Sequence, residues 1–227
     1  MKTRFRDRTE AGRYLATQLK AYQNQPNVLV MALPRGGVPV AYKVARALNL
    51  PLDVCLVRKL GVPGHPELAL GAIAAGGIRV LNDDIFSCHN ISKETLERVT
   101  AEESRELQRR DRVYRGDQPR PVIRDQTIIL IDDGIATGAT MRAAIAVLKA
   151  QRPQKIIVAT PVAPLETHHA LSEEADQVIC LATPTPFYAL SFWYENFAQV
   201  TDDEVRKLLD QQSHNHTHMS PALHPAI

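Results

Sequence analysis

Residues 127–162 contain the arrangement that most constrains the fold of this chain. Thr127–Ile131 and Lys155–Val162 are apolar runs, and residues 141–149 between them have apolar side chains at helical spacing. A strand, a helix and a strand in this order form the βαβ unit of a parallel α/β sheet. The sequence therefore predicts an open parallel sheet flanked by helices.

Other segments extend this alternation. The apolar run 28–33, bounded by Pro26 and Pro34, is typical of a strand buried on both faces. Residues 58–77 are rich in glycine and proline, which predicts a loop, although 70–75 and Ile78–Leu81 are expected to pair as a hairpin across Gly76-Gly77. We further expect helices over 8–22, 40–48, 92–114, 166–174 and 202–211, and strands over 52–57 and 178–181.

The composition excludes several classes of protein. A net charge of +2 over 227 residues does not predict nucleic-acid binding. The three cysteines have neither a disulfide framework nor metal-site spacing, which indicates thiols in the cytoplasm. The N-terminal residues have no apolar run, and no run is long enough to cross a membrane, so we predict neither a signal peptide nor a membrane partner.

The loop between the first strand and the helix of this βαβ unit has an acidic end and an anion-binding end. Asp132 and Asp133 follow the strand directly, where ligands bind in open parallel sheets. Gly134 and Gly138 permit close backbone approach, and the loop ends at a helix N-terminus, which favours a phosphate. The residues expected to hold the phosphate and sugar are Gly134, Ile135, Ala136, Thr137, Gly138, Ala139 and Thr140.

An ordinary turn between a strand and a helix, capped by an aspartate, would need one Asp and one Gly. The other residues of the nine-residue string would then have no role, so we favour a site for a sugar phosphate. Residues 128–140 resemble the phosphoribosyl-pyrophosphate motif of type I phosphoribosyltransferases, and the resemblance extends over roughly residues 27–185. The N- and C-terminal parts of the chain also resemble those of a group of uncharacterised bacterial proteins with this domain.

The resemblance implies a fold and a reaction. The expected fold is an open parallel sheet with a small hood, about 184–212, and a helical insertion, about 83–120, within a domain spanning 1–212. The expected reaction transfers ribose 5-phosphate from phosphoribosyl pyrophosphate to a nitrogen nucleophile, in the context of nucleotide metabolism. Mg²⁺ would be held through the substrate near Asp132 and Asp133, without a protein cage. A homodimer is expected, and a non-catalytic regulatory protein that binds the same ligand is the alternative.

Arg35-Gly36-Gly37 follows the strand predicted over 28–33. Two glycines expose amides, and the Arg35 guanidinium offers a forked cation for phosphate oxygens. By itself the segment fits a glycine-rich turn with a solvent-exposed arginine equally well. The family has its pyrophosphate loop here, often with a non-proline cis peptide, so we expect a cis bond between Pro34 and Arg35.

Arg58 and Lys59 come at the end of the strand predicted over 52–57. The run Arg58–Gly64 is similar to the start of the mobile catalytic loop of adenine phosphoribosyltransferases, with one residue fewer before Pro63. The two cations would then neutralise the leaving pyrophosphate, and the alternative is a pair of solvated cations. Glu67 is a candidate general acid or base, or the cap of a turn.

Family members that use 6-oxopurines carry a lysine at the end of the strand after the motif, where this chain has Thr160-Pro161-Val162. The sequence therefore does not support hypoxanthine or guanine as the acceptor.

Two further segments have ambiguous roles. Among the aromatic residues at 187–197, Tyr188 and Trp193 are candidates for stacking on a base, while Phe187 and Phe197 are expected to form a hydrophobic plug under the hood or a dimer contact. The helix predicted over 92–114 is rich in Arg and Glu, which usually means a solvated face with i,i+4 partners, although it could be a lid over phosphates. Residues 213–227 are expected to be a disordered tail.

Overall fold

The computed structural model describes residues 4–62, 65–82 and 92–219, and the side chains of 63–69 and 215–219 are outside this description. Its centre is a five-stranded parallel sheet in the order β2-β1-β6-β7-β8. The strands are β1 (Val28–Ala32), β2 (Leu52–Val54), β6 (Thr127–Ile131), β7 (Lys155–Val162) and β8 (Gln177–Ala182). The predicted α/β class with an open parallel sheet is therefore confirmed.

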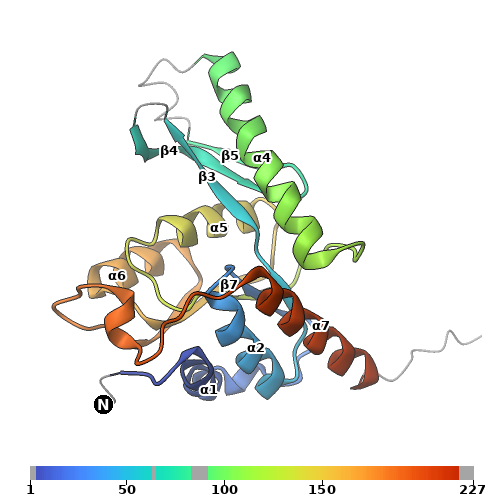
Figure 1. Cartoon of the computed structure of the whole chain (residues 1–227), viewed down its shortest axis with the longest axis vertical. Helices are drawn as coiled ribbons and strands as arrows, with labels where there is room; N and C mark the ends of the chain where they lie inside the picture. Colours follow the sequence, from blue (N-terminus) through green and yellow to red (C-terminus); the bar gives the residue numbers. More distant parts are fainter. Residues whose placement is uncertain (1–3, 63–64, 83–91, 220–227) are drawn as a thin grey trace, which may run out of the picture.

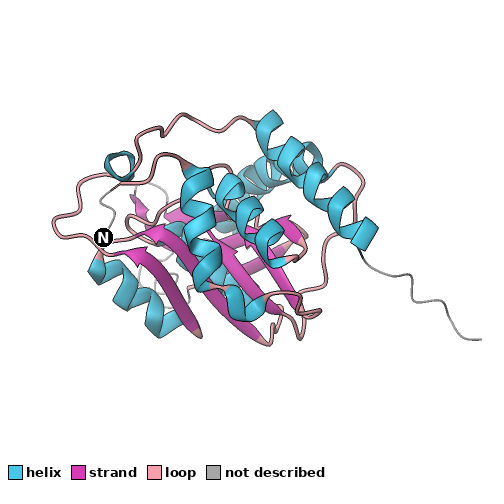
Figure 2. Ribbon diagram, turned by 90° about the horizontal axis from the view of Figure 1, so that it is seen from below, coloured by secondary structure: helices cyan, strands magenta, loops and turns pink. Residues whose placement is uncertain are grey.

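Helices cover both faces of this sheet, as Figure 2 shows. Alternate residues of β1 and β6 pack to opposite sides, so Val30 and Ile131 contact the side of α1 and α2, while Met31 and Leu130 contact the side of α5. This burial on both faces explains the continuous apolar runs. The helices are α1 (Arg8–Gln18), α2 (Gly37–Leu48), α5 (Ala139–Lys149), α6 (Leu165–Glu174) and α7 (Asp202–Met219), with the short 3-10 helices η1 (Lys20–Tyr22) and η2 (Leu190–Trp193).

A second, antiparallel sheet stands above the first (Figure 1). It contains β3 (Val57–Val62), β4 (His65–Ala74) and β5 (Ile78–Leu81), and α4 (Lys93–Arg115) packs beside it. The predicted hairpin is confirmed, because Ala74 pairs with Ile78 across Gly76-Gly77. The prediction of a loop over 58–77 was wrong. Gly61 is tolerated in β3 because the β3–β4 pairing is irregular there, where the register shifts.

The C-terminal helix is longer than the sequence predicted. α7 begins in a capping box, in which Glu204 N–H donates to Thr201 Oγ1 (3.1 Å) and Thr201 N–H donates to Glu204 Oε2 (3.0 Å). The helix continues to Met219, so the first residues of the expected disordered tail are helical, and residues 220–227 lie outside the description. No helix in the described ranges combines the length and apolarity needed to cross a bilayer.

Candidate functional site

The loops after β1 and β6 begin side by side at the carboxyl edge of the parallel sheet. Ala32 of β1 pairs with Ile131 of β6, and Leu33 N–H donates to Ile131 O (2.9 Å). The Pro34–Arg35 peptide bond is cis, as predicted. The two segments that the sequence assigned to phosphate and sugar binding therefore meet at one place.

Gly36 and Gly37 allow the β1 loop to touch the acidic pair. A Cβ atom on Gly36 would lie 2.1 Å from Asp133 Oδ2, and one on Gly37 would lie 2.7 Å from Ile131 O. Any side chain at Gly36 would therefore displace the Asp133 carboxylate. The Gly37 amide donates to Leu33 O (3.1 Å), and both glycines make room for the acids of the neighbouring loop.

The two aspartates have different surroundings. Asp132 is half-buried, and its Oδ1 accepts the N–H of Asp133 (2.8 Å). Burial, together with the neighbouring Asp133 carboxylate, holds the pKa of Asp132 well above its usual range. Asp133 is 7% exposed and forms an ion pair with Arg8, whose Nε lies 2.6 Å from Asp133 Oδ2. Arg8 was not among the predicted site residues, and no local sequence pattern links it to the motif.

Tyr194 adds a third segment to this acidic end. Its hydroxyl donates to the carbonyl oxygen of Asp133 (2.5 Å), and its side chain is buried. Burial raises the pKa of Tyr194, which keeps the phenol protonated as a donor. The sequence placed this tyrosine in an aromatic segment without assigning it a contact with the motif.

The phosphate end of the loop lies at the start of α5. Gly138 is in the left-handed conformation (φ 75°) immediately before α5, which begins at Ala139 rather than at 141. Ala136, Thr137 and Thr140 are exposed, as expected for residues that face a ligand. Ile135 is different, because its side chain is buried and its N–H donates to Val162 O (2.9 Å).

The hood covers this loop. A Cβ atom on Gly134 would lie 2.3 Å from Leu190 Cδ2 of η2, so this glycine lets the hood pack directly on the motif. Tyr188 is 73% exposed and lies beside exposed Phe192, with ring centroids 5.8 Å apart. Tyr188 is thus free to contact a ligand, as the base-stacking prediction requires.

Two other aromatic side chains pack within the hood. Trp193 is half-buried and stacks on Phe187 (6.3 Å between ring centroids), so much of its surface is used in packing. Phe197 stacks on Tyr194 (5.0 Å between centroids), so Phe187 and Phe197 each pack on an aromatic ring of the hood, as expected for a hydrophobic plug.

Arg35 and Arg58, two of the predicted cations, have acidic neighbours. Arg35 Nη1 lies 3.8 Å from Asp202 Oδ1, at the start of α7. Arg58 Nε lies 2.5 Å from Glu103 Oε2 on α4. Lys59 pairs with Ala72, which packs against α5, so Lys59 lies on the opposite face of β3 from Arg58. The structure therefore separates Arg58 from Lys59. Glu67 belongs to β4, but its side chain is outside the described residues.

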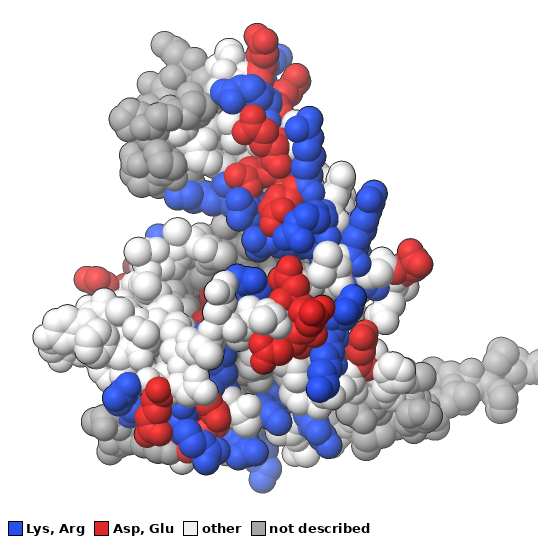
Figure 3. All heavy atoms as spheres, viewed as in Figure 1, with Lys and Arg blue, Asp and Glu red and all other residues white. Residues whose placement is uncertain are grey.

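Charged side chains of both signs cover the visible face of α4 (Figure 3). The expected i,i+4 pairs are present, for example Arg110–Glu106 (2.7 Å). Asp202 links this helix to α7 and to Arg35, because it accepts a hydrogen bond from Tyr114 (2.6 Å) and lies 3.9 Å from Arg109 Nη1. The sequence did not indicate this junction, since Asp202 follows Tyr114 by 88 residues.

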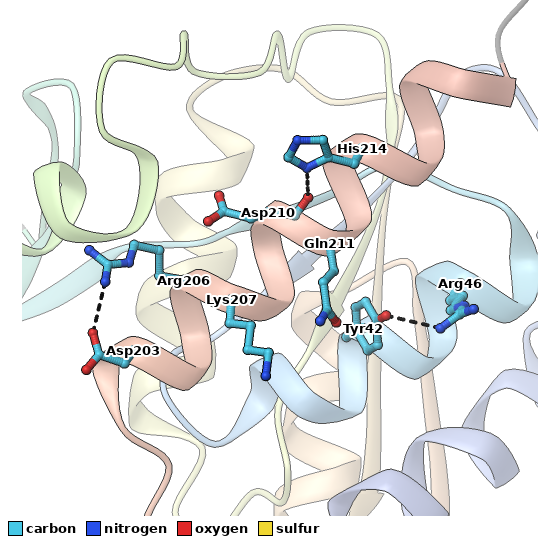
Figure 4. Close-up of a pocket in the computed structure, with 8 residues that line it drawn as sticks. All are labelled: Tyr42, Arg46, Asp203, Arg206, Lys207, Asp210, Gln211 and His214. Atoms are coloured by element: carbon cyan, nitrogen blue, oxygen red, sulfur yellow. Dashed lines mark hydrogen bonds and ion pairs between the residues drawn. The ribbon is translucent and has the colours of Figure 1, made fainter.

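A separate groove of about 630 Å³ lies between α2 and α7 (Figure 4). Its polar groups bind one another, as in the Arg206–Asp203 pair (3.1 Å) and the Arg46–Tyr42 hydrogen bond (3.2 Å). It contains none of the predicted site residues, so the carboxyl edge of the sheet is the stronger candidate. The lining residues are Tyr42, Arg46, Asp203, Arg206, Lys207, Asp210, Gln211 and His214.

The acidic edge can accept hydroxyl groups or a cation bound through a ligand. Within the described ranges, no group of three His, Cys, Asp or Glu side chains is arranged to hold a metal ion. The oxygen atoms of Asp132 and Asp133 suit Mg²⁺, a hard cation that keeps several waters and shares substrate oxygens.

Comparisons with known proteins agree with this geometry. The profile of the family described as "Phosphoribosyl transferase domain" matches residues 6–189. Two Mycobacterium tuberculosis proteins, provisionally named phosphoribosyl transferases, are 45% identical to this chain over 207 residues, which is 91% of the chain. The chain spans about half the length of these curated relatives, 46% of each.

A Thermus thermophilus protein of known crystal structure is similar over almost all of this chain. The TM-score is 0.84 at 41% sequence identity, and the match covers 92% of this chain and 99% of the other. The match to the family profile covers the parallel sheet, the second sheet, α4 and the start of the hood. The chain therefore belongs to the phosphoribosyl transferase family.

Proposed function

We propose that this chain transfers the ribose 5-phosphate of phosphoribosyl pyrophosphate to a nitrogen nucleophile, with a nucleobase as the acceptor class. The observation that supports this most strongly is the contact between the loops after β1 and β6, where Gly36 lies against Asp133. One loop offers carboxylates and a helix N-terminus, and the other offers a cation and backbone amides. This polarity matches a ribose that carries phosphate on one side and pyrophosphate on the other.

Different residues bind different parts of the ligand in this proposal. The loop from Gly134 to Thr140 binds the 5′-phosphate, and the acidic end accepts ribose hydroxyls. Arg35 binds the pyrophosphate, as does Arg58 once it leaves Glu103, whereas Lys59 lies on the opposite face of β3 and is not assigned to this role. Mg²⁺, when bound through the substrate, adds positive charge near the pyrophosphate and the ribose hydroxyls.

The reaction breaks the bond between C1′ and pyrophosphate and forms a bond between C1′ and the acceptor nitrogen. Pyrophosphate leaves with the bonding electrons, and the acceptor loses a proton to Glu67 or to solvent. Positive charge develops on the sugar ring as in glycoside chemistry, so positioning and charge compensation supply most of the catalysis.

The acceptor is not a 6-oxopurine in this proposal. β7 begins at Lys155, which pairs with Thr127 at the start of β6, so this lysine lies at the opposite edge of the sheet from the motif. At the carboxyl end of β7 the chain has Thr160-Pro161-Val162, and Thr160 is buried. Exposed Tyr188 is the candidate for contact with the base.

The described thiols, Cys55 and Cys180, are free, which supports a cytoplasmic location.

Pyrophosphate release tests this function. The full chain is incubated with phosphoribosyl pyrophosphate, Mg²⁺ and a panel of purine and pyrimidine bases. We expect release with at least one base, and loss of release in the Asp132→Asn/Asp133→Asn double variant. Asp117→Asn, at an exposed aspartate outside the site, is the matched control. Tight ligand binding without product from any base would replace the enzyme with the regulatory alternative.

A further inference from the structure

Arg8, near the N-terminus of the domain, contacts Asp133 of the motif. It is the first residue of α1 and lies 125 positions before Asp133, yet its Nε is 2.6 Å from Asp133 Oδ2. The side chains are 11% and 10% exposed, respectively. An ion pair this close to full burial needs fixed geometry on both sides, because removing either partner leaves a desolvated charge.

The hood fixes the orientation of Arg8. Its Nη1 donates to Ala198 O (2.8 Å), and its guanidinium carbon lies 4.0 Å from the centre of the Phe197 ring. A planar guanidinium can form an ion pair, donate a second hydrogen bond and stack on an aromatic ring at once. A lysine ammonium at this position could not make all three contacts.

Asp133 is enclosed on its remaining sides. Gly36 lies against its carboxylate, and the Tyr194 hydroxyl donates to its backbone carbonyl (2.5 Å). Asp132 is less enclosed, because it is half-buried and has no cation within ion-pair distance among the described side chains. The neighbouring acids of the motif therefore differ in the freedom that they have to meet a ligand.

We propose that Arg8 is a positioning residue that holds Asp133 as a neutralised anchor of the loop, so that Asp132 is the acid that meets the ribose hydroxyls. This inference rests on the proposed function. It has an electrostatic reason, since phosphoribosyl pyrophosphate is a polyanion and two uncompensated carboxylates beside it would oppose binding. Arg8 removes one of these charges without entering the ligand site itself.

The test compares Arg8→Met, Asp133→Asn and the double variant. Calorimetric titration with phosphoribosyl pyrophosphate and Mg²⁺ gives the affinity, and thermal unfolding gives the stability. We expect Arg8→Met to weaken binding by about tenfold or more, because it leaves a buried carboxylate unpaired. The Arg8→Met/Asp133→Asn variant should bind more tightly than Arg8→Met, since both charges of the pair are gone.

Three further variants sharpen the comparison. Arg8→Lys should bind with intermediate affinity, because it keeps the positive charge and loses the planar set of guanidinium donors. Asp132→Asn should lose binding whether or not Arg8 is present, and should raise the KM for phosphoribosyl pyrophosphate in turnover assays. Arg6→Met is the matched control, since the Arg6 side chain is 60% exposed on the same segment.

Two results would overturn the inference. One is a loss of affinity in Asp133→Asn as large as that in Asp132→Asn, combined with no recovery in the double variant. The other is an Arg8→Met variant with unchanged affinity. If Arg8→Met does not fold, the double variant still carries the test. If the wild type binds no phosphoribosyl pyrophosphate, the proposed function fails separately, while recovery of stability in the double variant still tests the pairing.

Discussion

Gly36 illustrates how one residue connects the two loops of the site. Its backbone is in an ordinary conformation (φ −60°), so the chain needs glycine here for space rather than for backbone freedom. The missing Cβ would sit 2.1 Å from Asp133 Oδ2 and 2.6 Å from Asp133 Cγ. Even the smallest side chain therefore has to displace the carboxylate that Arg8 holds.

We predict that Gly36→Ala lowers the affinity for phosphoribosyl pyrophosphate by at least about tenfold, because the Arg8–Asp133 pair cannot keep its geometry. Calorimetric titration measures the change. Gly77→Ala is the control. Gly77 has a φ of 81° and no atom within 4 Å of the added Cβ. That control should lose about 1–2 kcal/mol of stability from its backbone conformation and keep its affinity. Equal affinities in the wild type and Gly36→Ala would contradict the prediction.

Single residues were predictable from the sequence where a local string encodes them. The cis bond before Arg35 was expected from the family resemblance, while Asp132, Asp133 and the glycines of both loops follow from short motifs. Arg8 and Asp202 do not, because their partners lie 125 and 88 positions away and a long-range contact leaves no periodic or local pattern. Arg58 was identified as a cation, but its pairing with Glu103 depends on how α4 packs on β3.

At the scale of elements, α4 is joined to the rest of the site through Asp202. Tyr114 is 3% exposed and donates to Asp202 Oδ1 (2.6 Å), and Arg35 approaches the same carboxylate. Burial, followed by the bond to Asp202, raises the pKa of Tyr114 to about 12, so it remains a donor at neutral pH. The charged helix is therefore held beside the loop after β1 in this structure.

We predict that Tyr114→Phe lowers the free energy of unfolding by about 1–2 kcal/mol, because it removes a hydrogen bond to a charged acceptor from a buried position. Urea unfolding measures this as a lower midpoint with an unchanged slope. Tyr22→Phe is the control, since the Tyr22 hydroxyl makes an exposed hydrogen bond to Gln177 (3.0 Å). Its effect should stay within about 0.5 kcal/mol. Equal losses in the two variants would refute a specific role for the Tyr114–Asp202 contact.

The elements were predicted well where one period dominates. β6 and β7 have the predicted boundaries, because continuous apolar runs end at polar or glycine-containing loops. The prediction for residues 58–77 was wrong, because Gly61 and the nearby prolines are also typical of turns. Gly71 is a glycine in this range that is required by strand packing and not by a turn. A Cβ there would lie 2.1 Å from Val80 O, so this glycine belongs to a close strand pair.

At the scale of the whole molecule, α5 lies between the two sheets. Ala144 and Leu148 pack toward the parallel sheet, while Ala143 and Val147 pack toward the antiparallel sheet beside Ala72. A helix with apolar residues on opposite sides is buried on both. Residues of both sheets also share one core, in which Leu60 and Ile73 join Val30. One face of the second sheet thus shares the core of the first sheet, while its other face packs against α5 in a separate cluster.

We therefore predict that the domain unfolds in a single cooperative transition, hood included. The only tryptophan, Trp193, lies in the hood and reports its unfolding by fluorescence, while far-ultraviolet circular dichroism reports all helices and strands. The hood is tied to the sheet through Tyr194 and to the N-terminal segment through the backbone bond from Phe5 to Trp193 O (2.8 Å). Both signals should change at the same urea concentration and with the same slope.

The Arg8→Met/Asp133→Asn variant locates the source of this cooperativity. It removes the ion pair between α1 and the motif but leaves the Tyr194 hydrogen bond and the shared core in place. If these suffice to couple the hood to the sheet, the two signals should still coincide, although at a lower urea concentration. A fluorescence change that precedes the loss of secondary structure in this variant, and not in the wild type, would show that the ion pair is the connection. An early fluorescence change in the wild type itself would contradict the single transition.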